Sequence, residues 1–213
     1  FGVWNDTQTR SIHLGFAVFL AFVAFPAFKG KYRDKIPLLT WATAAVGALT
    51  ASYLWYGYVG VAERTGHPSQ TDLIMAGIGI VLLAEAARRS LGFPLMGVAL
   101  FFLSYVFFGS WEGLPDIVRW KGASFSKAMS HMWLTSEGVF GVALGVSSSF
   151  VFLFVLFGAL LNQAGAGNYF LKLAFAGLGH LRGGPAKAAV IASAATGLIS
   201  GSSIANVVTT GTF

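Results

Sequence analysis

Small polar residues are concentrated near the end of the chain, where their oxygen atoms could hold an ion. They are Ser200, Gly201, Ser202, Ser203, Asn206, Thr209 and Thr210. On a helix, Ser202, Asn206 and Thr209 would share one face. Ser203, Asn206 and Thr210 would share a face as well. Hydroxyl and amide oxygens, with carbonyl groups freed where a helix unwinds over residues 200–203, suit a hard monovalent cation such as sodium. Alternatively, these groups cap one another and pack helices together.

The cluster follows an apolar segment, and no charged residue appears after Lys187. Residues 188–199 can form a membrane-inserted helix that rises about 1.5 Å per residue, which places Ser200 roughly 18 Å from Ala188. Since a hydrocarbon core is about 30 Å thick, the cluster would lie somewhat past its middle. Backbone at that depth can leave helical geometry only where protein or a watery cavity satisfies its polar groups. The pattern therefore indicates a binding site.

A second polar cluster interrupts the uncharged run over residues 138–171. It consists of Gly145, Val146, Ser147, Ser148 and Ser149. Such an interruption is typical of the tip of a re-entrant hairpin or of a broken helix. Serines also pack well between ordinary membrane helices, so the residues alone leave both interpretations open.

The composition predicts an all-α integral membrane protein. Hydrophobic residues make up 55% of the 213 residues and charged residues only 10%, in clumps separated by long uncharged runs. The net charge of +6 could indicate nucleic-acid binding. Its basic residues are instead distributed among loops, as expected of a membrane protein, so we expect no nucleic-acid partner and take the lipid bilayer as the surroundings.

Signatures of enzymes are largely missing from the sequence. The four histidines are far apart, and none pairs with another ligand at a metal-binding spacing on an apolar helix. The sequence has no cysteine, and its serines lack the strand-turn-helix setting of a nucleophile elbow. We therefore expect no enzymatic activity.

Several apolar segments are candidates to cross the membrane and to position these clusters. Before residue 138 they are 11–28, 36–62, 73–87 and 91–108, and residues 124–134 form an amphipathic piece that would lie along the membrane surface or lead into the next insertion. Glu85 stands three and four residues before Arg88 and Arg89, which favours an ion pair at a helix end over a buried proton relay.

The distribution of basic residues predicts the orientation. If the spans alternate, one side receives Lys29, Lys31, Arg33, Lys35, Arg88, Arg89, Lys172, Arg182 and Lys187. The other side receives Arg10, Arg64, Arg119, Lys121 and Lys127, together with six acidic residues. Because Lys and Arg accumulate in cytoplasmic loops, the first side should be cytoplasmic. A re-entrant hairpin at residues 145–149 would alter this alternation after residue 134.

Four stretches carry a resemblance to a known family. They read TSEGVFGVALGVS at 135–147, FVFLFVLFG at 150–158, RGGPAKAA at 182–189 and ISGSSIANVVTTGTF at 199–213. Together they resemble the fused permease of tripartite ATP-independent periplasmic (TRAP) transporters of the TAXI subtype. The resemblance implies a sodium-coupled importer in a bacterial or archaeal inner membrane. A periplasmic TAXI-type substrate-binding protein would deliver a small organic acid to it.

The resemblance also implies an organisation and a site. Residues 1–123 would form a scaffold like the small subunit, and residues 124–213 would begin the large transport subunit, which moves substrate in an elevator motion with broken helices and a re-entrant hairpin. Sodium would be held by Ser200, Gly201, Ser202, Ser203 and Asn206. Substrate would be held by Ser147, Ser148, Ser149, Asn206, Thr209 and Thr210.

Two further expectations concern completeness and rival functions. The chain begins at Phe1 and ends at Phe213 inside an apolar segment, so we expect it to be a fragment that contains only part of the transport site. An ion channel would use the same polar tip as a filter. A non-transporting membrane scaffold is the other alternative.

Overall fold

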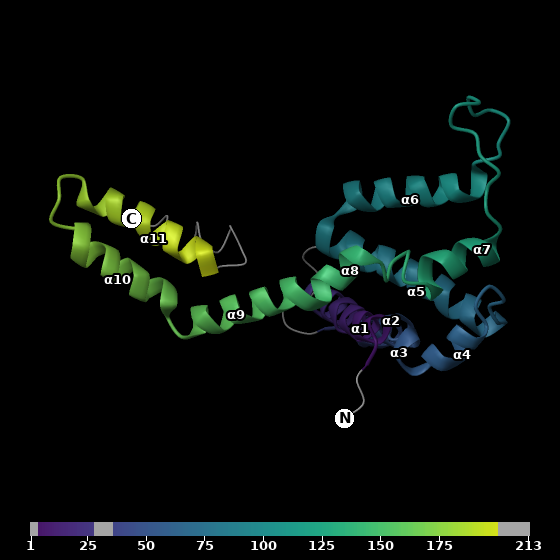
Figure 1. Cartoon of the computed structure of the whole chain (residues 1–213), viewed down its shortest axis with the longest axis horizontal. Coiled ribbons are helices and arrows are strands. Elements are labelled where there is room, and N and C mark those ends of the chain that lie inside the picture. Colours follow the sequence, from purple (N-terminus) through teal and green to yellow (C-terminus); the bar gives the residue numbers. More distant parts are fainter. Residues whose placement is uncertain (1–3, 28–35, 200–213) are drawn as a thin grey trace. The chain divides into compact units, whose positions relative to one another are not determined.

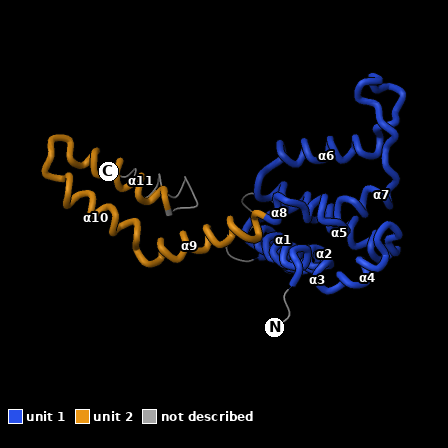
Figure 2. Tube along the Cα trace, in the orientation of Figure 1, with its two compact units in different colours: residues 1–145 blue, residues 146–213 orange. Residues whose placement is uncertain are grey.

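The computed structural model describes residues 4–27 and 36–199, and these ranges contain helices and no strand (Figure 1). The chain divides into two compact units, residues 1–145 and 146–213 (Figure 2). The predicted division at residue 123/124 concerns subunit-like regions rather than compact units, and it stays a prediction.

Unit 1 begins with a well-capped helix, α1 (Asp6–Ala24). The Gln8 backbone N–H donates to the Asn5 side chain over 2.8 Å, and the Gln8 side chain accepts from the Asn5 backbone N–H over 3.2 Å. This reciprocal arrangement satisfies two backbone donors at the helix start. One face of α1 then buries Leu14, Val18 and Phe22.

The uncharged run over residues 36–62 forms three helices, so the prediction of one continuous span there was wrong. They are α2 (Leu38–Ala51), α3 (Tyr53–Tyr56) and α4 (Tyr58–Glu63), separated at Ser52 and Gly57. The break is stabilised from another helix, because the Ser11 hydroxyl donates to the Ala51 carbonyl over 2.8 Å. That bond satisfies one of the carbonyl groups that a helix end leaves without an internal partner.

The next two helices form a hairpin. Helix α5 (Gln70–Leu91) is capped by Ser69 and ends at Gly92, whose φ of 91° lies in the region that favours glycine. Helix α6 (Phe93–Phe108) follows at once and returns beside α5 (Figure 1). None of the residues of α6 is buried.

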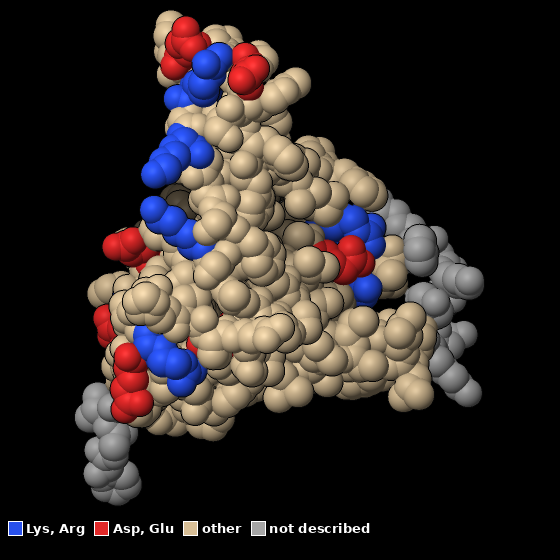
Figure 3. Space-filling model, turned by 90° about the vertical axis from the view of Figure 1, so that its right-hand side faces the viewer, with Lys and Arg blue, Asp and Glu red and all other residues tan. Residues whose placement is uncertain are grey.

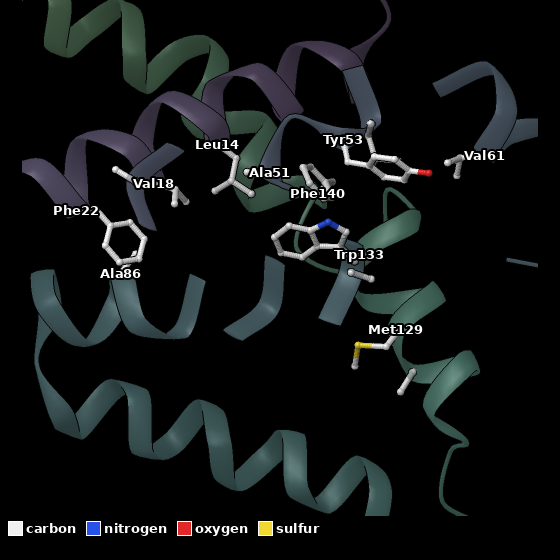
Figure 4. Packing of buried hydrophobic residues seen from close by; sticks show 14 residues of the cluster. Leu14, Val18, Phe22, Ala51, Tyr53, Val61, Ala86, Met129, Trp133 and Phe140 are labelled. Atoms are coloured by element: carbon white, nitrogen blue, oxygen red, sulfur yellow. The ribbon is translucent and has the colours of Figure 1, made fainter. Parts of the chain in front are cut away.

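The core of unit 1 is completed by the segment after α6. Helix α7 (Phe125–Met129) continues into the π-helical turn η1 (Ser130–Leu134). The turn delivers Trp133, whose ring lies edge-on to Phe140 with 5.4 Å between centroids. Figure 4 shows this pair beside residues of α1, whereas α6 carries none of the side chains drawn. Gly79 on α5 makes room for Trp133, since a Cβ there would overlap the indole ring.

Unit 2 contains most of one long helical stretch, which begins at the end of unit 1, and a helical hairpin. Helix α8 (Val142–Val146) leads through the π-helical turn η2 (Ser147–Val151) into α9 (Phe152–Gln163). After Gly165, with a φ of 82°, the hairpin is formed by α10 (Ala166–Leu178) and α11 (Gly184–Ile199). Leu171 and Ala174 on α10 pack against Ala188 and Ala192 on α11.

Within the described ranges, two helices are long and apolar enough to cross a membrane. They are Gln70–Leu91 and Val142–Gln163, each of 22 residues, and the second counts α8, η2 and α9 as one helix. Shorter apolar helices are Leu38–Ala51 and Phe93–Phe108. The chain is therefore all-helical where it is described, whereas the multi-span elevator architecture stays a prediction.

Candidate functional site

The predicted sodium site lies outside the described residues. This holds for Ser200, Gly201, Ser202, Ser203 and Asn206, and also for Thr209 and Thr210. The structure does describe α11, the helix that leads to them. The predicted helix over residues 188–199 is confirmed, and it begins four residues earlier, at Gly184.

Thr196 on α11 is a site candidate that the sequence reasoning missed. Its side chain is 2% exposed, and its Oγ1 atom has no hydrogen-bond partner within the described ranges. A threonine in a helix commonly donates to the carbonyl four residues earlier, so an unpaired buried hydroxyl is unusual. Thr196 precedes Ser200 by four residues and Ser203 by seven, which puts its oxygen in line with theirs if the helix continues. That spacing could have been read from the sequence.

The serine cluster at 147–149 does not form the tip of a hairpin in this structure. The backbone at Val146 and Phe152 is right-handed helical, and the chain continues without reversal from Val142 to Gln163. Two causes are visible. Residues 146–157 contain no glycine, and the Ser149 hydroxyl lies 3.5 Å from the Val146 carbonyl, so the helix itself accommodates this side chain. The interruption predicted from sequence is present as the five-residue π-helical turn η2.

The π-helical turn still marks these serines as candidates. Ser147 and Ser148 are half-buried and Ser149 is exposed. Single π-turns inside α-helices are rare and occur frequently at functional sites. Contact between this cluster and residues 200–210 remains a prediction.

A polar network in unit 1 is centred on Asp72 at the start of α5. The carboxylate is 1% exposed and accepts hydrogen bonds from the Tyr53 hydroxyl, from the Ser69 backbone N–H over 2.8 Å and from Arg64 Nη2 over 3.2 Å. The hydrogen bond to Asp72 raises the pKa of the Arg64 guanidinium above its usual value. Because the buried Asp72 carboxylate accepts hydrogen bonds from three donors, it suits a structural role better than proton transfer.

A cavity of about 250 Å³ adjoins the network and is lined in part by Arg64, Asp72 and Thr65. Sequence reasoning missed the network, since Arg64, Thr65 and Asp72 fall between the candidate spans 36–62 and 73–87. The pattern Ser69-x-x-Asp72 is a capping-box pattern and could have indicated the local part of it.

The predicted ion pair of Glu85 is confirmed. The carboxylate oxygens lie 2.7 Å from Arg88 Nε and 2.8 Å from Arg89 Nε. The two guanidinium groups also cover aromatic rings, Arg88 over Phe93 at 5.4 Å and Arg89 over Phe22 at 4.5 Å. Glu85 therefore holds two cations at the end of α5 and is not an isolated buried acid.

Arg10 is a further residue whose role was not visible in the sequence. Its Nη1 atom donates to the Phe140 carbonyl over 3.0 Å, and its Nη2 atom lies 3.5 Å from the Asp6 carboxylate. The partner is 130 residues away along the chain. Arg10 thus ties α1 to the segment from which the helix Val142–Gln163 starts.

Metal ligands of the usual kind do not converge within residues 4–27 and 36–199, where no group of three or more His, Asp or Glu side chains occurs.

A family model described as "Tripartite ATP-independent periplasmic transporter, DctM component" matches residues 78–213. The match begins within α5, covers more than half of the chain and includes the polar stretch over residues 200–210. Comparison with curated proteins and with solved structures gave no match.

Proposed function

Because the chain belongs to the DctM family of TRAP transporters, we propose that it imports a small organic acid together with sodium. It is a membrane component of such a transporter, and the family implies a periplasmic substrate-binding protein as its partner. We further propose that this partner is of the TAXI type, as the stretches over residues 135–213 suggest by resemblance, and that the protein works in a bacterial or archaeal inner membrane.

One observation carries the proposal. The family match extends across α11 and the oxygen-rich stretch that follows it. In this proposal, sodium is bound by Ser200, Gly201, Ser202, Ser203 and Asn206, and its positive charge helps to hold a carboxylate beside it. The buried Thr196 hydroxyl on α11 supports the proposal, because it is an oxygen without a hydrogen-bond partner among the described residues and lies four residues before Ser200 in the sequence.

The substrate would lie beside the ion. We propose contributions from Ser147, Ser148 and Ser149 in η2 and from Asn206, Thr209 and Thr210. Serine hydroxyl oxygens are suitable ligands for a cation or for a donor on the substrate.

Uptake into proteoliposomes tests the proposal. Full-length protein is reconstituted with its binding protein, a sodium gradient and a panel of labelled organic acids. Uptake of one acid should require both the gradient and the binding protein and should saturate. A channel would conduct without the binding protein, and a scaffold would give no uptake.

Two variants test the assignment of the ion site. Ser202→Ala and Asn206→Ala should each raise the sodium concentration needed for half-maximal uptake by about tenfold, which corresponds to roughly 1.4 kcal/mol. Ser110→Ala, in the polar segment after α6, is the matched control and should leave sodium dependence unchanged. Unchanged sodium dependence in both site variants would refute the assignment.

A further inference from the structure

An apolar groove lies between α5 and α6 in unit 1. It has a volume of about 410 Å³, and all of the residues that line it are apolar. Ala84 and Ala87 line it from α5, and Leu95, Ala99 and Val106 line it from α6. From Leu95 to Val106 the groove extends about 17 Å along the helix. The small alanine side chains leave this space between the two helices, and its volume falls in the range of ligand sites, about 300–1,000 Å³.

One end of this groove meets a positively charged corner. Arg88 follows the lining residue Ala87 directly, and its guanidinium covers the ring of Phe93, the first residue of α6. Arg88 donates through Nε and Nη2 to Glu85 and to the Ala27 carbonyl. Its Nη1 group takes no part in these bonds, and 21% of its side chain is exposed.

The charges at this corner do not balance. Within residues 4–27 and 36–199, two guanidinium groups share the single carboxylate of Glu85, which leaves one positive charge in excess among the described side chains. Arg89 is 8% exposed in its side chain, and its Nη1 atom has no hydrogen-bond partner within the described ranges. The corner therefore has more donors and more positive charge than the described residues around it satisfy.

We propose that this groove and corner bind an anionic phospholipid, with an acyl chain along α6 and the phosphate at Arg88. A soluble carboxylate would leave the apolar groove unfilled, and a zwitterionic lipid would leave the excess charge uncompensated. Basic pockets between membrane helices bind anionic headgroups on the cytoplasmic side, which is the side predicted for Arg88. The lipid site is independent of sodium coupling and of substrate.

Thermal unfolding of the full-length protein tests the lipid site. In nanodiscs, phosphatidylglycerol should raise the unfolding temperature by several degrees relative to phosphatidylcholine. Arg88→Gln should remove most of this difference by weakening the headgroup contact, and Ala99→Phe should remove it by filling the groove. The matched controls are Arg119→Gln, at an exposed position of unit 1, and Ala159→Phe, on the exposed surface of α9. Both should retain the difference in unfolding temperature between the two lipids. Equal stabilisation by both lipids, or a difference retained in Ala99→Phe, would overturn the proposal.

A second measurement uses the unmodified protein, so that its result does not depend on whether the variants fold. Phosphatidylglycerol with a photoreactive group in its acyl chain should crosslink to peptides of α5 and α6, and excess unlabelled phosphatidylglycerol should compete more strongly than phosphatidylcholine. If these peptides are not labelled, another helix of the protein fills the groove and the proposal fails. Sodium-dependent uptake is measured separately, so either proposal can fail alone.

Discussion

The carboxylate of Asp72 accepts hydrogen bonds from Tyr53, Arg64 and Ser69, which lie 19, 8 and 3 residues before it. Replacing Asp72 with alanine would leave the Tyr53 hydroxyl and the Ser69 backbone N–H without their acceptor. Each buried group left unsatisfied costs about 1–3 kcal/mol, whereas the Arg64 side chain is 43% exposed and can turn to water. We expect Asp72→Ala to lower the unfolding temperature of the detergent-solubilised protein by several degrees.

Asp116 provides the matched control for that measurement. It also pairs with an arginine, Arg119, over 3.3 Å, but its side chain is 91% exposed. Exposed ion pairs contribute about 0–1 kcal/mol, so Asp116→Ala should leave the unfolding temperature nearly unchanged. If the two substitutions lower the unfolding temperature equally, burial of Asp72 does not contribute to stability.

A comparison of Glu85 with Asp72 shows which residue contacts could be predicted from the sequence. The Glu85 pair was predictable because its partners are three and four residues away on one helix. The Tyr53 partner of Asp72 is 19 residues away. Its position depends on the break at Ser52, which hydrophobicity alone does not indicate.

At the scale of elements, close packing of α1 against α2 depends on Gly47. A Cβ at this position would lie 2.8 Å from Val18 Cγ1 and 3.3 Å from the Phe22 ring. Small residues let membrane helices approach, and added volume in a packed interface typically costs about 1–3 kcal/mol. We expect Gly47→Val to lower the unfolding temperature measured in detergent.

Gly97 on α6 is the control for Gly47. No atom lies within 4 Å of a Cβ built there, and alanine is favoured over glycine in a helix by about 1 kcal/mol. Gly97→Ala should therefore leave stability unchanged or raise it slightly. A Gly47 variant as stable as the unmodified protein would show that the α1–α2 contact is not tight.

Some of the helices were predictable from the sequence, and others were not. Long apolar runs correctly indicated the helices α5 and α6. The described chain does not reverse at 145–149, since serines fit into a helix by bonding within it, and a re-entrant hairpin in the membrane stays a prediction. The helix break at Ser52 is stabilised by a tertiary partner, Ser11, so local composition could not reveal it.

At the scale of the whole molecule, much of the apolar surface has no cover within the described residues. Only 6% of the apolar window in Val142–Gln163 is buried, and α6 buries none of its residues. Charged side chains gather in separated groups on the face in Figure 3, with uncharged surface between them. In water such a surface would be unstable, whereas lipid tails or further helices can cover it. This surface agrees with membership of a membrane transporter family.

The predicted orientation can be measured because the 213 residues contain no cysteine. Single cysteines are introduced into the full-length protein, freed of any other cysteine, at four exposed positions, His67, Ser90, Glu137 and His180. Alternating spans predict that cysteines at 67 and 137 react with an impermeant reagent outside intact cells. Those at 90 and 180 should react only after the membrane is opened, because basic residues accumulate on the cytoplasmic side.

The pair 137 and 180 decides how the helix Val142–Gln163 lies in the membrane. A continuous helix of 22 residues is about 33 Å long and can cross a hydrocarbon core. The two cysteines then react from opposite sides. A re-entrant hairpin would return the chain to its starting face, so both would react from outside. That result would restore the hairpin and would also reverse the side assigned to the start of α11.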